Sequence, residues 1–157
     1  TGMRRAEVLG LKWQWIDLKA KTIHLPGEET KGFSSREVPL NTESVQILRQ
    51  WHMQHGRPSK GRVFSHSDGA AIQNMKKSFG KLLKDAGIEP TPQGRVTWHS
   101  LRHTFGTRLG QGGCDAETLR SLMGHASITT TQRYLHSDDA RRRAAVEALS
   151  NGQSNES

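Results

Sequence analysis

The 157-residue sequence has one cysteine, Cys114, one tyrosine, Tyr134, and no long apolar run. A single cysteine excludes an intramolecular disulfide and any zinc site that needs two cysteine ligands from this chain. No stretch approaches the length of a membrane-spanning helix, and no signal peptide heads the chain, so we expect a soluble cytoplasmic protein that does not act on a membrane. Cys114 lies among glycines and is expected to be a loop or helix-entry residue, not a nucleophile.

Acidic residues are also scarce, with 15 Asp and Glu against 23 Lys and Arg, and the formal net charge is +8. Such a surplus is typical of proteins that bind polyanions, and nucleic acid is the leading candidate partner. A well-solvated basic surface is the alternative, because net charge alone does not separate the two. Hydrophobic residues make up 32% of the sequence, which suits one globular domain with one sizeable core.

Alternating apolar residues predict a small antiparallel sheet near the start of the chain. Three short runs typical of strands, WIDL, TIHL and REVPL, lie between residues 13 and 40. The second and third runs flank a loop that contains Lys31, and glycines at both ends of this loop permit tight turns. We therefore expect a hairpin with Lys31 exposed in its loop.

Helical spacing and capping residues predict helices on both sides of this sheet. A short helix in RAEVLGL precedes the sheet, and the later helices are expected to begin after the caps Thr42, Thr97 and Asp115. Another helix carries an apolar stripe formed by Ile72, Met75, Phe79, Leu82 and Leu83. Further short helices are expected over 129–137 and 138–149. The predicted fold is mainly α with a small antiparallel β-sheet, an α+β arrangement.

The stretch HSLRHTFGTRL, from His99 to Leu109, raises a specific chemical question. On a helix, His99 and His103 share one face, as zinc ligands often do, and His125 or His136 could join them. His99 and Arg102 also share a face, and that pair suits a phosphate group. We expect Leu101 and Phe105, with Trp98, to hold this helix in the core.

Four segments, taken in order with the basic surface, resemble the tyrosine recombinases, the phage-integrase family of DNA strand-exchange enzymes. The segments are TGMRRAEVLGL, ETKGFSSREVPL, HSLRH and LMGHASITTTQRYLH. The resemblance implies a catalytic domain over residues 1–149 that lacks upstream helices and an N-terminal DNA-clamping domain, followed by a disordered tail over 150–157. The residues at the family's catalytic positions are Arg4, Lys31, His99, Arg102, His125 and Tyr134.

The resemblance implies DNA cleavage and rejoining through a 3′-phosphotyrosine at Tyr134, with no ATP, metal or cofactor. Such chemistry needs a nucleophilic oxygen, cations on the phosphate oxygens and a proton donor for the leaving oxygen. Arg4 and Arg102 can present planar forks of donors to the phosphate. The family's roles for the other positions are general acid for Lys31, acid/base partner for His99 and hydrogen-bond donor for His125. The zinc alternative is weaker, because HSLRH lacks the glutamate of the His-Glu-x-x-His pattern.

Each residue taken alone has a simpler explanation, and only the combination favours catalysis. Arg4 could simply pair with Glu7 across one helical turn, and Tyr134 could be a half-buried core residue. A topoisomerase of type IB and a non-catalytic DNA-binding remnant are the two alternatives. We also expect a homo-oligomer, a tetramer on double-stranded DNA, with the segment around Val146 and Leu149 docked on a neighbouring subunit. The basic residues expected to contact DNA include Arg5, Lys12, Lys76, Lys77, Lys81, Lys84, Arg95 and Arg133.

Overall fold

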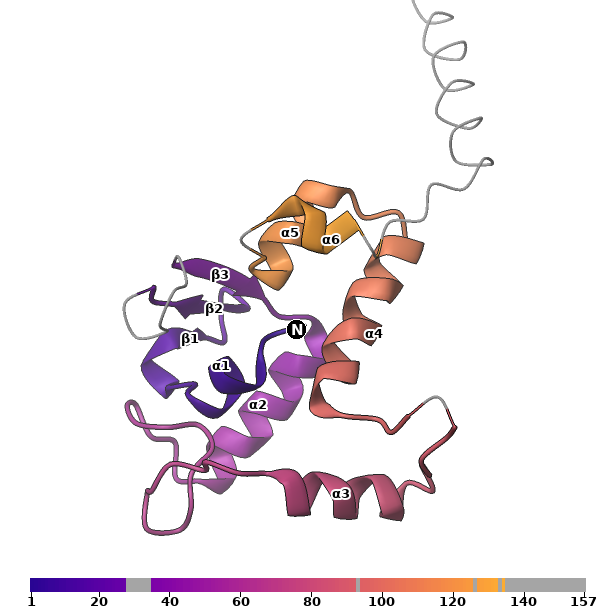
Figure 1. Cartoon of the computed structure of the whole chain (residues 1–157). Coiled ribbons are helices and arrows are strands. Elements are labelled where there is room, and N and C mark those ends of the chain that lie inside the picture. The colour runs from indigo at the N-terminus through magenta and orange to yellow at the C-terminus, as the bar shows by residue number, and fades with distance from the viewer. Residues whose placement is uncertain (28–34, 93, 126, 133, 135–157) are drawn as a thin grey trace, which may run out of the picture.

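A computed structural model describes residues 1–27, 35–92, 94–125, 127–132 and 134, and it combines a small sheet with several helices (Figure 1). The sheet is antiparallel, with strand order β1-β2-β3. Its strands are β1 (Ile16–Asp17), β2 (Thr22–Leu25) and β3 (Arg36–Pro39). The three runs predicted as strands are therefore confirmed.

Side chains of the central strand alternate between core and solvent. Ile23 and Leu25 are buried, whereas His24 between them is exposed. Ile23 pairs with Ile16 on one side and with Val38 on the other. The period of two residues thus places the apolar side chains of the sheet on one face, against the helices.

The α-helices of the described residues agree with the predicted order, whereas the 3-10 helix η1 (Trp13–Trp15) was not predicted. The α-helices are α1 (Arg5–Leu9), α2 (Thr42–Gln54), α3 (Lys76–Asp85), α4 (Trp98–Gln111), α5 (Ala116–Met123) and α6 (Ile128–Gln132). The helix expected over 138–149 lies outside the described residues. The predicted caps Thr97 and Asp115 are confirmed, because their side chains accept hydrogen bonds from the amides of Ser100 and Thr118. The predicted cap of α2 is wrong by one residue. Asn41 caps this helix, and its side-chain oxygen accepts the amide of Ser44 at 2.9 Å.

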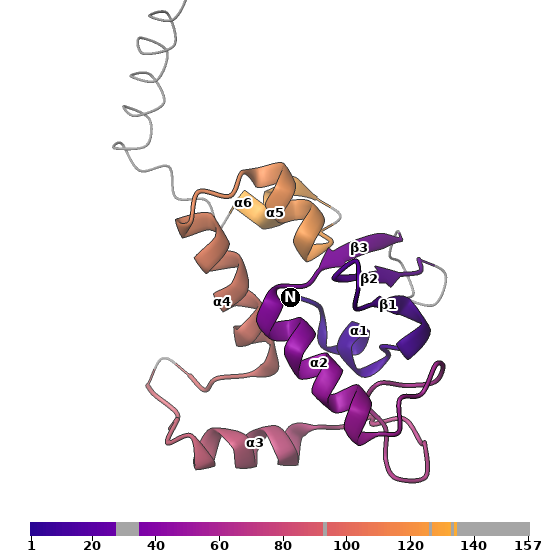
Figure 2. The ribbon, with the colours of Figure 1, turned by 180° about the vertical axis from the view of Figure 1, so that it is seen from behind.

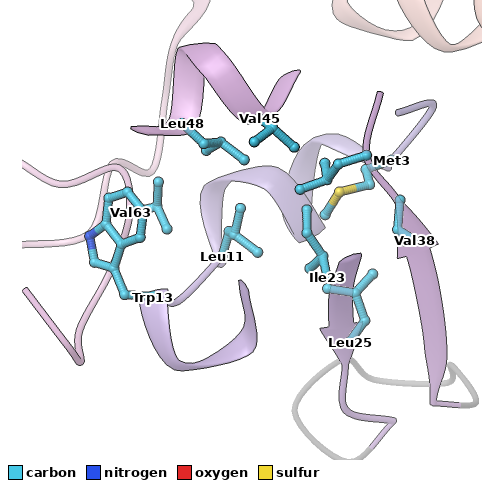
Figure 3. Close-up of a cluster of buried hydrophobic side chains, with 10 residues drawn as sticks. Met3, Leu11, Trp13, Ile23, Leu25, Val38, Val45, Leu48 and Val63 are labelled. Carbon is cyan, nitrogen blue, oxygen red and sulfur yellow. The ribbon is translucent and has the colours of Figure 1, made fainter. Parts of the chain in front are cut away.

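The larger hydrophobic cluster joins the sheet to α1 and α2 (Figure 3). Trp51 of α2 extends this contact, and its indole Nε1 donates a hydrogen bond to the carbonyl of Val63 at 2.8 Å. The buried members of the cluster are Met3, Leu11, Trp13, Ile23, Leu25, Val38, Leu40, Val45, Leu48 and Val63. This cluster anchors the N-terminal segment that carries Arg4.

A second cluster joins α4, α5 and the residue that follows α6. Its buried members are Leu119, Met123 and Tyr134, and Phe105 and Leu109 of α4 pack against them. The described residues therefore form two hydrophobic clusters, where composition suggested one core. The N-terminal segment lies between the parts that contain these clusters in both views (Figures 1 and 2).

The helix α3 departs from the expected packing. Figures 1 and 2 show it at the opposite end of α4 from α5 and α6. None of its residues is buried, and Leu82 is 61% exposed. Phe79 makes a ring contact with Trp98 at 5.5 Å between centroids, whereas Leu101, expected in the core, is 51% exposed. An apolar stripe identifies a helix face, but it does not supply a neighbouring element to cover that face.

Candidate active site

A groove with a volume of about 910 Å³ is lined by residues from the start of the chain, α3, the start of α4 and the segments around α6. Four of the six predicted catalytic residues line it: Arg4, His99, Arg102 and His125. Arg4 immediately precedes α1, His99 and Arg102 lie in the first turns of α4, and His125 follows the cap of α5. The shared helix face predicted for His99 and Arg102 therefore opens onto one groove.

Arg102 is the most buried cation of this groove, with 5% of its surface exposed. Its guanidinium donates a hydrogen bond to the carbonyl of Gly2 at 2.6 Å and another to the carbonyl of Met123. Burial lowers the pKa of Arg102 to about 10, and the positive charge of Arg4 acts in the same direction. The group still carries its charge at neutral pH, so it is a fixed cation in a constrained orientation.

Arg4 is held from two sides. Its guanidinium donates to the carbonyl of Gly124 at 2.5 Å and to the carboxylate of Glu7 at 3.2 Å. The backbone amide of Arg4 also donates to Glu7, at 2.7 Å. The predicted pairing of Arg4 with Glu7 is confirmed. It orients Arg4 and leaves 27% of the surface of this side chain exposed.

Glu7 is 2% exposed and has a second partner, Arg36 of β3. Arg36 forms a bidentate contact, with its two terminal nitrogens 2.7 and 2.9 Å from the carboxylate oxygens. Burial would raise the pKa of the Glu7 carboxyl, but hydrogen bonds from Arg36 and Arg4 and their charges lower it overall. Sequence reasoning missed Arg36, because no local pattern connects a residue at the start of a strand to a carboxylate in α1.

Tyr134 lies beside the groove residues, with 6% of its surface exposed, although it is not among the residues that line the groove. Its hydroxyl oxygen is 2.8 Å from Nδ1 of His103. Its ring is nearly parallel to that of His125, with an angle of 14° and 6.3 Å between centroids. Nδ1 of His125 is in turn 3.0 Å from the hydroxyl of Thr131, a fully buried residue that sequence reasoning also missed.

Glycines permit the close approach of Tyr134 to α4. A Cβ atom at Gly110 would collide with the carbonyl oxygen of Tyr134, and one at Gly106 would lie 3.0 Å from a ring carbon of Tyr134. Gly2 plays a similar part at the start of the chain, where its φ of +62° and the ring of Phe105 leave no room for a side chain. These glycines thus allow both Tyr134 and the segment that precedes Arg4 to pack against α4.

The predicted DNA-contacting residues have different positions. Arg5, Lys76 and Arg95 line the groove, and Lys77, Lys81 and Lys84 are exposed on α3. Nζ of Lys12 instead lies 4.9 Å from the ring centroid of Trp15. Lys31 and Arg133 lie outside the described residues, as do His136, Val146 and Leu149.

The histidine pair of the zinc alternative does make contact. The rings of His99 and His103 meet edge to face, with centroids 4.6 Å apart. Within the described ranges, no group of three or more His, Cys, Asp or Glu residues is placed to hold a metal ion. The same part of the chain contains no helix with the length and hydropathy needed to cross a bilayer.

Comparison with known sequences gives one consistent family. Residues 1–141 match the model of the phage integrase family. The chain is 35% identical over 144 residues to tyrosine recombinase XerD of Mycobacterium leprae, which covers 85% of this chain and 44% of that protein. It is 31% identical over 140 residues to tyrosine recombinase XerC of Pseudomonas aeruginosa, covering 88% and 44%. The chain thus spans less than half the length of these relatives.

Solved structures show the same fold. The crystal structure of the XerA recombinase superposes with a TM-score of 0.72 and 29% identity, covering 99% of this chain and 54% of that one. The catalytic domain of bacteriophage HP1 integrase gives a TM-score of 0.67 and 28% identity, covering 99% and 78%. The predicted α+β fold and the predicted resemblance are confirmed: the described helices and sheet are those of a tyrosine-recombinase catalytic domain, and this chain belongs to the phage integrase family.

Proposed function

We propose that this chain carries the catalytic site of a site-specific DNA recombinase, which cleaves and rejoins double-stranded DNA through Tyr134. The observation that carries the proposal is the convergence of Arg4, Arg102, His99 and His125 on one groove, with Tyr134 stacked against His125. The names of the relatives support it, and the XerH recombinase bound to its difH substrate resembles this chain with a TM-score of 0.71 and 28% identity.

In the proposed cleavage step, the phenolic oxygen of Tyr134 attacks a phosphorus atom of the DNA backbone. The new bond is a 3′-phosphotyrosine, and the bond from phosphorus to the 5′-oxygen breaks. Arg4 and Arg102 stabilise the negative charge on the non-bridging oxygens, since both cations are already oriented by carbonyl groups. His125 donates a hydrogen bond to the phosphate, His99 acts as an acid/base partner, and Lys31 protonates the leaving 5′-oxygen.

The energy of the broken bond is conserved in the phosphotyrosine, so the 5′-hydroxyl of another strand can displace Tyr134 without ATP. We propose that residues 1–149 form the catalytic unit and that residues 150–157 are a disordered tail. We also propose that the enzyme works in the cytoplasm as a homotetramer on DNA, with the segment containing Val146 and Leu149 contacting a neighbouring subunit. Basic residues of the groove and of α3 would contact the backbone without reading sequence.

Covalent capture tests the proposal and does not require a defined target site. The protein is incubated in EDTA with duplexes that carry a random central stretch and a nick, so that a released 5′-hydroxyl fragment diffuses away. Adducts are recovered under denaturing conditions, sequenced and mapped by mass spectrometry. We expect adducts at Tyr134, and none with Tyr134→Phe, which should still bind DNA. An adduct that survives this substitution contradicts the proposal.

The DNA products of the reaction distinguish recombination from topoisomerase activity. With two copies of the captured site on one plasmid, a recombinase yields recombinant joints, whereas a type IB topoisomerase relaxes supercoils without a partner site. We expect recombinant joints that Tyr134→Phe abolishes. DNA binding with no adduct on any of the random duplexes would instead indicate a non-catalytic remnant.

A further inference from the structure

We propose that His103 is the general base of the cleavage step and accepts the phenolic proton of Tyr134. The inference rests on the proposed role of Tyr134 as nucleophile, and it assigns to His103 the removal of the phenolic proton that the family resemblance would leave to His99. His103 lies on α4, one residue after Arg102 and one helical turn after His99. Its Nδ1 is 2.8 Å from the hydroxyl oxygen of Tyr134, within the range needed for direct proton transfer.

The burial of Tyr134 favours a protein base over bulk water. The residue is 6% exposed, so bulk water has little access to the phenol. Among the side-chain hydrogen bonds of the described residues, the contact with His103 is the one that reaches this hydroxyl. His125 is oriented differently, because its ring lies nearly parallel to the tyrosine ring and its Nδ1 is directed to Thr131.

His103 also has a route for the proton away from the DNA groove. It lines a second, shallower hollow on α4 together with Ser100, Thr107 and Arg108, and its side chain is partly exposed there. His99 lines the same groove as Arg4 and Arg102, whereas His103 is not among the residues that line it. His103 thus touches the nucleophile from one side and solvent from the other.

Protons and bonds balance in both directions of the reaction. The lone pair on Nδ1 of His103 takes the proton while the oxygen of Tyr134 forms its bond to phosphorus and the bond to the 5′-oxygen breaks. His103 becomes an imidazolium cation, and the leaving oxygen receives its proton from the general acid. In rejoining, the imidazolium returns a proton to the tyrosine oxygen as the 5′-hydroxyl attacks phosphorus.

Single-turnover cleavage of the captured nicked duplex tests this assignment. We expect His103→Ala and His103→Gln to form adduct about 10²- to 10⁴-fold more slowly, the usual contribution of a general base. Thr107→Ala, in the same hollow and one turn along α4, is the matched control and should cleave at the wild-type rate. Because the hollow is open to solvent, added imidazole should restore cleavage by His103→Ala, with more basic imidazoles acting faster.

A substrate with sulfur in place of the bridging 5′-oxygen separates the two ends of the reaction. A thiolate leaves without a general acid, so this substrate rescues a variant that lacks the acid and does not rescue one that lacks the base. We expect no rescue of His103→Ala. Full rescue, wild-type rates in either His103 variant, or a defect that imidazole leaves unchanged while DNA binding and thermal unfolding are normal would each overturn the assignment.

The controls keep the two hypotheses apart. If wild-type protein forms no adduct, or if Tyr134→Phe still forms one, the proposed function fails. If wild-type protein forms its adduct at Tyr134 and His103→Gln cleaves equally fast, the proposed function stands and the role of His103 alone is excluded.

Discussion

Arg4 and Arg102 donate hydrogen bonds to consecutive carbonyl groups at the end of α5, Arg4 to Gly124 and Arg102 to Met123. The last carbonyls of a helix lack partners within the helix and form the negative end of its dipole. They therefore attract both guanidinium groups and offset part of the repulsion between them. The C-terminus of α5 brings together two cations from distant parts of the sequence before any DNA is bound.

A side chain at position 124 should destabilise the protein. Its φ is +61°, and a Cβ atom would lie 2.7 Å from Cζ of Arg36. We expect Gly124→Ala to lower the free energy of unfolding by about 1–3 kcal/mol from the backbone conformation alone, with a further loss from the collision. Gly87→Ala, at φ +67° with open space around it, isolates the backbone contribution. Urea unfolding measures both, and equal losses would argue against a collision at Arg36.

Stability should depend on the ionisation of Glu7. The pKa of this carboxyl is lowered in the folded protein, so its contribution is present above the pKa of the unfolded chain and is lost as pH falls through the folded value. We expect the free energy of unfolding to decrease below about pH 4. Glu7→Gln should remove this part of the acid dependence and cost about 3–5 kcal/mol at neutral pH, because Arg36 is left without its carboxylate.

Urea unfolding between acidic and neutral pH checks this prediction. The exposed acid Glu43, at the start of α2, supplies the control Glu43→Gln, which should retain the acid dependence of the wild type. A Glu7→Gln variant as stable as the wild type at neutral pH would show that the pair with Arg36 adds nothing.

Thr131 should act through His125. The hydroxyl of this buried residue is 3.0 Å from Nδ1 of His125, and Thr131→Val keeps the shape while removing the hydrogen bond. Loss of one such bond corresponds to about 0.5–1.5 kcal/mol, so we expect adduct formation to slow about 2- to 10-fold with DNA affinity unchanged. Thr129→Val, at an exposed position of α6, should cleave normally. Equal rates for the two variants would refute the positioning role.

Gly110 should be required for the position of Tyr134. A Cβ atom at Gly110 would collide with the backbone carbonyl of Tyr134, which cannot yield as a flexible side chain would. We expect Gly110→Ala to reduce adduct formation more than it reduces DNA binding. Gly80→Ala, also within a helix but facing open space, should stabilise the protein by about 0.5–1 kcal/mol instead. Adduct formation at the wild-type rate in Gly110→Ala would contradict the prediction.

Salt dependence should identify the cations that contact DNA. Each phosphate contact contributes about 0.9 to the slope of log affinity against log salt concentration. We expect Lys76→Ala and Arg95→Ala, both in the groove, each to reduce that slope by about this amount. Lys19→Ala, in the exposed turn between β1 and β2, should leave the slope unchanged. Fluorescence anisotropy with a labelled duplex provides the measurement, and unchanged slopes for all three would place the DNA elsewhere.

Local rules account for what was predicted correctly. The alternation in TIHL places Ile23 and Leu25 in the core, and Thr97 caps α4, because both effects act within a few residues. Long-range packing accounts for the errors. The apolar stripe of α3 is real, but Leu82 is exposed because the described part of the chain places no element over that side of the helix.

The sequence by itself determined the order of the elements, the family, and the shared face of His99 and Arg102, since each depends on spacing along the chain. Only the tertiary structure decided that Arg36 neutralises Glu7, that the end of α5 holds Arg4 beside Arg102, and that His103 meets Tyr134. Each of these contacts joins residues from separate elements. No periodicity or motif encodes such a pairing, because it arises when the elements pack and buried polar groups must find partners.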